Sequence, residues 1–393
     1  MLIINAVVFM PDGTLAQDRF VRIAGTRIEA VGAMETLVLP EGEPVIDAAG
    51  AVVYPGFIDA HTHLGMFEDG LGFEGDDGNE DTDPCTPHLR AIDAVNPLDR
   101  CFQEAREAGI TSVLTGPGSA NPIGGQFAAI KTDGKCIDDM IIRAPAAMKF
   151  ALGENPKSVY HDKSTAPVTR MATSALIREQ LYKAKDYFTR KQDCEEEDQP
   201  EYDMKCESLG PLLRGEIPAQ IHAHRADDIF TAVRLAREFG LNYSIVHCTQ
   251  GYLAAEELAQ KGVCAMCGPV ISDRCKPELR DSTPANPGLL SHAGVKVCIV
   301  TDHPEVPIQY LPLCAGIAVR AGMDRTEALK AITIYPAEIA GISDRVGSVE
   351  PGKDADLVLF RGDPLSVEAG PECVIISGRI ILDKRTGVLN EGN

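Results

Sequence analysis

The chain has 393 residues, of which 44% are hydrophobic and 24% are charged, and its formal net charge is −21. Nucleic acids and anionic membranes bind basic surfaces, so this charge argues against both as partners and favours a small-molecule substrate. No stretch approaches the roughly 18 consecutive apolar residues of a membrane span, and no basic leader precedes the first apolar run, so we expect a soluble, cytoplasmic protein.

The twelve cysteines are scattered along the chain, without the density of a disulfide scaffold. We therefore expect reduced thiols, as in cytosolic proteins. Cys264 and Cys267 form a C-x-x-C motif, but no second pair completes a zinc knuckle, and we interpret the motif as part of a strand. We also expect a homo-oligomer.

The two ends of the chain share one pattern. Residues 1–54 alternate short β-rich runs with Gly, Asp and Pro, which predicts a small antiparallel sheet. Residues 345–393 do the same, with strands expected at 356–360, 373–377 and 379–382. Neither end is long enough to bury a core of its own, so we expect both to pair into one small β-sandwich domain beside a larger domain at 55–344.

Between the ends, apolar β-like runs alternate with helical patterns, which indicates βα units. Eight such runs predict an α/β fold, a (β/α)8 TIM barrel of parallel strands. The third run is the least regular, because Gly, Asn and Pro surround it. The expected strands are 52–61, 111–115, 127–132, 140–150, 219–222, 243–247, 263–269 and 295–302.

Several segments between these strands carry helix signals. Residues 227–239 are amphipathic and stop at Gly240, and Asp324 with Glu327 forms a capping box that opens a later helix. Residues 169–215 are long, polar and charged, which predicts an exposed helical excursion between the fourth and fifth strands.

His61 and His63 lie two residues apart at the end of the first expected barrel strand. Side chains two apart in a strand point to one face, so these imidazoles can chelate one cation. Such a pair alone is weak evidence, because histidines also serve as hydrogen-bonded core residues.

Three more runs end in a metal-compatible side chain, namely His222, His247 and Asp302. All strand C-termini of a parallel barrel meet at one mouth, so residues far apart in sequence converge there. As independent core residues, several of them would be buried polar groups without partners, which is costly. The pattern therefore predicts four histidines and one aspartate at a single metal site.

The chain resembles the amidohydrolase superfamily, close to its imidazolonepropionase-like and prolidase-like branch, and the resemblance covers nearly the whole chain. The motif at 55–65 would lead from the terminal sheet into the barrel, and the motif GKDADLVLF would mark the return. The motifs that carry the resemblance are PGFIDAHTHLG at 55–65, IHAHRADD at 221–228, IVHCT at 245–249, VTDHP at 300–304, AITIYPAEIAGI at 331–342 and GSVEPGKDADLVLF at 347–360.

The resemblance implies a hydrolase with one or two divalent transition-metal ions. It places His61 and His63 on the more buried ion, His222 and His247 on the second, and Asp302 on the first ion as well as in the role of proton shuttle. Zinc suits these imidazole and carboxylate ligands, and manganese, iron or cobalt are the alternatives.

The resemblance also calls for a bridging anion from the fourth strand. Lys149, near the end of that strand, is the candidate as a carboxylated lysine, because a carbamate supplies two anionic oxygens. Glu154 is the rival bridging group, and Lys131 on the third strand is a weaker contender. An unmodified surface lysine at 149 stays a further alternative.

Three residues near the expected mouth are candidate substrate contacts. Arg225 offers a guanidinium that can grip a carboxylate through two hydrogen bonds. His224 shares the strand face of His222 and is either a substrate contact or a metal ligand, and His303 follows Asp302 directly.

The expected reaction is hydrolysis of a C–N bond in an amide, cyclic amide or dipeptide, since a metal ion lowers the pKa of bound water to roughly 7. A mononuclear hydrolytic deaminase is the first alternative, but it usually carries an acid beside the histidine of the fifth strand, where this chain has Ala223, His224 and Arg225. A non-catalytic scaffold of the same fold is the second, and the complete ligand set argues against it.

Overall fold

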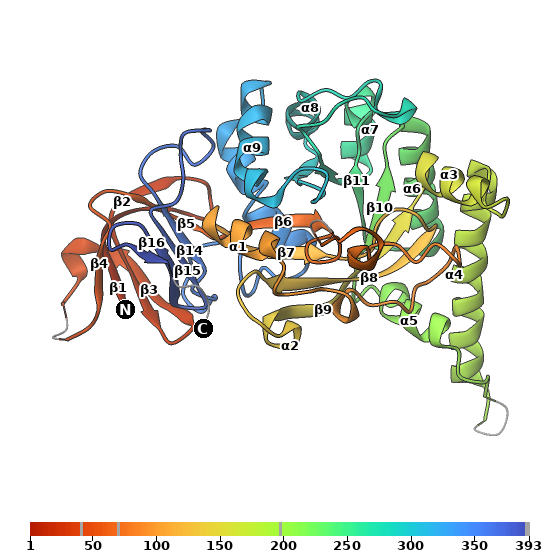
Figure 1. The fold of residues 1–393 in the computed structure, drawn as a ribbon, viewed down its shortest axis with the longest axis horizontal. Helices are drawn as coiled ribbons and strands as arrows, with labels where there is room; N and C mark the ends of the chain where they lie inside the picture. Colours follow the sequence, from red (N-terminus) through yellow and green to blue (C-terminus); the bar gives the residue numbers. More distant parts are fainter. Residues whose placement is uncertain (40–41, 69–70, 196–198, 390–393) are drawn as a thin grey trace.

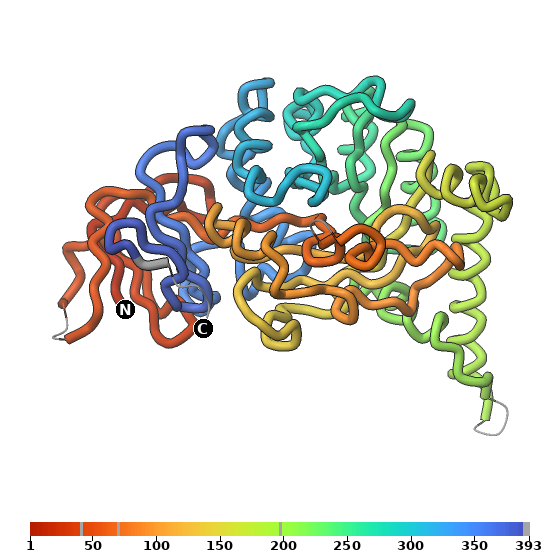
Figure 2. The backbone as a smooth tube through the Cα atoms, in the orientation of Figure 1, coloured from red at the N-terminus to blue at the C-terminus, as the bar shows by residue number. Residues whose placement is uncertain are grey.

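The computed structural model describes residues 1–39, 42–68, 71–195 and 199–389. Two β-sheets organise the fold, one formed by both ends of the chain and one by its middle (Figure 1). The backbone trace runs from the terminal sheet through the barrel and back, so strands 2–9 and 388–389 lie in the same sheet (Figure 2).

Within the part of the chain that the structure describes, the terminal sheet has nine strands. Its first five are β1 (Leu2–Phe9), β2 (Leu15–Ala24), β3 (Arg27–Ala33), β4 (Val45–Asp47) and β5 (Val52–Pro55), and its last four are β14 (Leu357–Phe360), β15 (Cys373–Ile376), β16 (Arg379–Asp383) and β17 (Val388–Leu389). The two ends meet where β5 pairs with β14 in antiparallel orientation. β1 pairs in parallel with β4 and β5, so the sheet is mixed and not purely antiparallel as expected. The predicted sandwich of two facing layers stays a prediction.

The second sheet is a nearly closed barrel whose eight strands follow sequence order. They are β6 (Phe57–Thr62), β7 (Ile110–Thr115), β8 (Ile123–Lys131), β9 (Ile141–Ala151), β10 (Ala219–Ala223), β11 (Tyr243–His247), β12 (Cys264–Cys267) and β13 (Lys296–Ile299). The first expected strand, 52–61, is divided between β5 and β6. The division falls at Gly56, where a Cβ would lie 2.0 Å from the Thr111 hydroxyl oxygen.

The prediction that all eight strands are parallel is wrong for β8, which pairs antiparallel with both β7 and β9. Only residues 116–122, with the sequence GPGSANP, separate β7 from β8. A parallel crossover needs a dozen or more residues, whereas so short a connection permits only a reversal of direction. The C-terminal end of β8 therefore lies at the opposite end of the barrel from the other seven.

Helices surround the barrel. They are α1 (Arg100–Glu107), α2 (Ile137–Met140), α3 (Glu154–Asp162), α4 (Arg170–Asp193), α5 (Met204–Leu213), α6 (Ala226–Phe239), α7 (Ala255–Gln260), α8 (Asn286–His292), α9 (Leu311–Arg320), α10 (Arg325–Lys330) and α11 (Ile334–Ile339). The expected end of α6 at Gly240 is confirmed, with φ +67° at this glycine. The Asp324 carboxylate accepts a hydrogen bond from the Glu327 amide at 3.0 Å and caps α10 as expected. Among the described residues, no helix has both the length and the apolar character that a bilayer crossing requires.

The excursion expected at 169–215 consists of α4 and α5, apart from residues 196–198, which lie outside the described residues. In Figure 1, α4 runs along the edge of the barrel farthest from the terminal sheet. One face of α4 buries Ile177 and Leu181, so the excursion is only partly exposed.

The reversed β8 carries Lys131 into the junction between barrel and terminal sheet. Its ammonium lies 2.9 Å from Asp354 and also contacts Asp356, and all three side chains are buried. Lys131 is thereby removed from the candidates for a bridging group, because its strand ends away from the barrel mouth.

We expect Lys131→Met to lower the free energy of unfolding by about 3–5 kcal/mol, because it leaves the buried Asp356 carboxylate without its cation, whereas Asp354 keeps Arg27 and Arg345. Urea denaturation of the variant measures this loss. Lys135→Met, which removes an exposed lysine four residues later, is the matched control. A loss below about 1 kcal/mol, the range of surface pairs, would contradict a buried structural role for Lys131.

Candidate metal centre

A cavity of about 450 Å³ opens at the end of the barrel where the parallel strands finish. His63, His222, His247 and Asp302 line it, and they follow or end four different strands. The cavity is therefore built at the position that a parallel barrel reserves for its active site.

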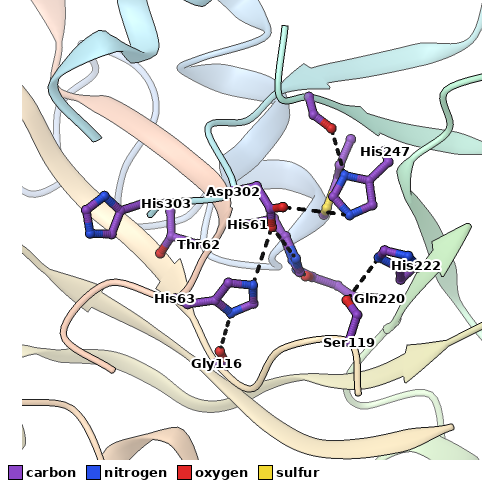
Figure 3. Close-up of polar contacts among 12 residues, drawn as sticks. His61, Thr62, His63, Gly116, Ser119, Gln220, His222, His247, Asp302 and His303 are labelled. Carbon is purple, nitrogen blue, oxygen red and sulfur yellow. Dashed lines mark hydrogen bonds and ion pairs between the residues drawn. The ribbon is translucent and has the colours of Figure 1, made fainter. Parts of the chain in front are cut away.

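The first donor cluster consists of His61, His63 and Asp302, whose potential ligand atoms lie within 4.8 Å of one another. Asp302 Oδ1 is 3.4 Å from the Nε2 atoms of both histidines. Figure 3 shows the three side chains converging on one point.

Hydrogen bonds behind this cluster set the tautomers of its histidines. His61 Nδ1 donates to Gln220 Oε1 at 2.6 Å, and His63 Nδ1 donates to the Gly116 carbonyl at 2.7 Å. In the neutral imidazole, Nε2 then carries the lone pair, so two lone pairs face the Asp302 carboxylate. Three electron donors directed at one point repel each other unless a cation lies between them, and the cluster therefore fits a metal ion.

The second donor cluster consists of His222, His224 and His247. The His247 Nδ1 atom donates to the Gly268 carbonyl at 2.7 Å, which again leaves the lone pair on Nε2. The Nε2 atom of His222 is buried without a hydrogen-bond partner. His224 stacks on His247 with ring centroids 4.3 Å apart, so His224 lies inside this cluster.

Burial favours the neutral imidazole at four of these histidines. Burial lowers the pKa of His61, His222 and His224 well below its usual value, and lowers that of His247 as well. Metals bind the deprotonated imidazole nitrogen, so burial keeps these side chains in the form that can act as ligands.

Lys149 belongs to β9, the fourth strand of the barrel, and its side chain is fully buried. Its Nζ atom is 3.1 Å from His61 Nε2. Burial lowers the pKa of this lysine to about 7. The fourth strand thus directs Lys149 at the first cluster, close to the metal ligands as the sequence predicted.

Two residues of the site have backbone dihedrals in the left-handed region, His247 with φ +69° and Asp302 with φ +56°. Such a conformation costs of order 1–3 kcal/mol in a residue other than glycine and persists where the surrounding structure enforces it. Asp59 helps to hold the second of these turns, since its Oδ2 accepts hydrogen bonds from the amide and the hydroxyl of Thr301.

The structure places three candidate residues away from both clusters. Glu154 is the first residue of α3, and its carboxylate accepts a hydrogen bond from the Glu278 amide at 3.3 Å, so it bridges nothing in the clusters. The exposed Arg225 guanidinium binds both carboxylate oxygens of Asp227 at 2.9 Å and is absent from the described cavity lining.

In Figure 3 the His303 ring points away from His61 and His63, and its Nδ1 accepts a hydrogen bond from the Ile308 amide at 3.2 Å. The expectation that Arg225 and His303 contact substrate stays a prediction, and neither side chain is directed at the two clusters in this structure. Both are occupied by local hydrogen bonds that fix the chain after a strand. Of the three expected substrate contacts, only His224 lines the cavity.

Sequence reasoning missed Gln220 and Glu278. Gln220 lies two residues before His222 on β10, so strand alternation alone places it on the same face. Glu278 follows β12 in a charged segment that is typical of an exposed loop, yet its side chain is only 1% exposed. Its Oε1 atom lies 3.6 Å from His224 Nε2 and 3.8 Å from His222 Nε2.

Comparisons with known proteins give consistent results. A family model described as "Amidohydrolase family" matches residues 214–381. The crystal structure of an amidohydrolase from Thermotoga maritima MSB8 is 40% identical and superposes with a TM-score of 0.92, covering 97% of this chain and 99% of that chain.

Two relatives found by sequence are less similar to this chain than that crystal structure is, and one of them is much longer. The amidohydrolase tasK of Hapsidospora irregularis is 33% identical over 372 residues, which make up 88% of this chain but 38% of tasK, so this chain spans well under half of that protein. An imidazolonepropionase of Porphyromonas gingivalis is 23% identical over 385 residues, covering 89% of this chain and 83% of the relative.

Proposed function

Because this chain belongs to the amidohydrolase family of hydrolytic enzymes, we propose that it hydrolyses a C–N bond in a small amide, cyclic amide or dipeptide at a centre of two divalent metal ions. The observation that carries the proposal is the pair of donor clusters at the barrel mouth, each of which brings three potential ligand atoms within 4.8 Å of one another. Zinc suits these imidazole and carboxylate donors best.

In this proposal, His61, His63 and Asp302 hold the first ion, and His222 and His247 hold the second. When bound, such ions supply Lewis acidity that activates a water molecule and polarises the substrate carbonyl. The chain itself contributes the orientation of the ligands, because the hydrogen bonds to the histidine Nδ1 atoms fix each ring.

Asp302 stands where both clusters and the cavity meet. Its Oδ1 faces His61 and His63, and its Oδ2 lies 4.0 Å from His247 Nε2. Since it also lines the cavity, its carboxylate can accept the proton of the attacking water and pass it to the leaving nitrogen.

We propose further that Lys149 is carboxylated and bridges the two ions. The neutral amine adds to the carbon of carbon dioxide and releases one proton, which yields a carbamate with two oxygens that share one negative charge. An unmodified ammonium 3.1 Å from a metal-binding nitrogen would repel both cations, whereas the carbamate attracts them.

Lys149→Ala should lower the metal content and the activity, and added short carboxylates should restore part of both. In the wild-type protein equilibrated with ¹³C-bicarbonate, NMR should show a carbamate carbon that Lys149→Ala lacks. Lys135→Ala, which changes an exposed lysine, should keep the resonance. Full metal content in Lys149→Ala would contradict the bridging role.

The reaction itself is tested by incubating metal-replete protein with N-acyl amino acids, Xaa-Pro dipeptides, hydantoins and lactams, and by assaying the release of amine or acid. Cleavage of one class that stops on chelation supports the proposal. Release of ammonia from cyclic amidines by a protein with one ion per chain would favour the mononuclear deaminase instead.

The organisation of the sheets supports a proposal about domains. Residues 1–54 and 345–393 would form the small domain, and 55–344 the barrel. In support, some side chains of β1, β2, β14 and β15 form a core cluster of their own, while others on β14 and β15, such as Val358 and Val374, belong to the main cluster of the barrel.

A further inference from the structure

Glu278 lies in the short 3-10 helix η6 (Pro277–Leu279), within the loop that follows β12. The two oxygens of its carboxylate have different surroundings. Oε2 accepts a hydrogen bond from the Glu154 amide at 3.1 Å, at the beginning of α3. Oε1 points to the second cluster, 3.6 Å from His224 Nε2 and 3.8 Å from His222 Nε2.

The backbone around Glu278 is adapted to this arrangement. Gly153, directly before α3, has φ +83°, and a Cβ at this position would lie 2.9 Å from Glu278 Oε2. Only glycine adopts this conformation freely and leaves space for the carboxylate. One oxygen is therefore held against the helix, and the other is held against the histidines.

The Glu278 carboxylate is too far from the His222 and His224 rings for a hydrogen bond to either of them. Glu278 Oε1 and His222 Nε2 are both buried atoms without a hydrogen-bond partner, which is costly unless another group satisfies them. Ligands that each lie about 2.0–2.1 Å from one ion can be at most about 4 Å from each other, and the 3.6 and 3.8 Å separations fall within this limit. One cation among these atoms would satisfy all of them.

We propose that Glu278 and His224 are ligands of the second metal ion, together with His222 and His247. This inference rests on the proposed function and adds a carboxylate from a loop, and a second histidine from the fifth strand, to the ligands that strand ends supply. The same loop lines the cavity through Pro269, Ser272 and Lys276, so the second ion would also tie this wall of the cavity to the barrel.

An ion pair with Lys276 could also hold Glu278 in this position. The Lys276 ammonium lies 2.9 Å from Glu278 Oε1, so Glu278 has a cationic neighbour in the structure. Lys276 also donates a hydrogen bond to Asn155 Oδ1 at 2.8 Å, and its side chain is 27% exposed. Lys276 thus has a second partner in Asn155, whereas His222 Nε2 is buried without any hydrogen-bond partner.

The test is the metal content of the full chain, reconstituted with zinc and dialysed against defined free zinc. Wild type should hold two ions per chain, and Glu278→Gln should lose one, with a rise of at least about tenfold in the dissociation constant of the second ion. His224→Asn, which leaves the contact between Glu278 and α3 intact, should lose the same ion. Lys276→Met, which removes the competing cation, should retain two.

Retention of the first ion shows that each variant is folded, and the visible spectrum of the cobalt-substituted protein reports the geometry of the second. Two ions bound with unchanged dissociation constants in Glu278→Gln, or in His224→Asn, would overturn the inference. So would Lys276→Met if it lost the ion as readily as Glu278→Gln. A wild-type protein without metal would instead contradict the proposed function.

Discussion

A protein carrying both His61→Ala and His63→Ala should lose the first metal ion, and its hydrolytic turnover should fall by about 10³-fold or more. The two imidazoles present lone pairs to one point from a single strand end, and alanine removes both. Metal ions supply several kcal/mol of transition-state stabilisation, which corresponds to a loss of this size. Elemental analysis and steady-state kinetics measure the two effects.

The matched control is the double variant His161→Ala with His292→Ala, because both of these histidines are exposed. It should keep the metal content and turnover of the wild type. Unchanged metal content in the variant of His61 and His63 would contradict the assignment of these residues as ligands.

Asp302→Asn should keep the fold and much of the metal while kcat falls by about 10²-fold or more. The asparagine amide has the shape of the carboxylate and can still offer an oxygen, but it cannot accept the proton of the attacking water. Asparagine also tolerates the positive φ of this position, so the backbone turn should survive.

Kinetics and metal analysis of the same preparation separate proton transfer from metal loss. Asp186→Asn, at an exposed position on α4, serves as the control for a neutralised carboxylate. Near-normal turnover in Asp302→Asn would remove Asp302 from the reaction and leave it a packing residue only.

Much of the fold follows from local patterns in the sequence. Alternating apolar runs predicted the barrel, and the stop signal at Gly240 ended α6 where expected. The direction of β8 was mispredicted because strand character says nothing about orientation, and only the short connection 116–122 contains that information. The parallel pairing of β1 with β5 depends on contacts distant in sequence, which local patterns do not report.

The site, like the fold, contains residues that local sequence patterns predict and residues that they do not. His61, His63, His222, His247 and Asp302 converge because each ends or follows a parallel strand of one barrel, and Lys149 follows the same rule. Glu278 reaches the site on a loop, whose path is set by packing against α3 and not by periodicity. The sequence also did not predict that the Arg225 guanidinium binds Asp227, two residues away.

The central claim is that two metal ions occupy the two donor clusters. Diffraction data collected at the zinc absorption edge, from crystals of zinc-replete wild-type protein, test it most directly. We expect two anomalous peaks, one about 2.0–2.1 Å from the Nε2 atoms of His61 and His63 and the other at the same distance from those of His222 and His247. An anomalous map without a peak at either cluster, from protein that still hydrolyses its substrate in the presence of a chelator, would contradict the account.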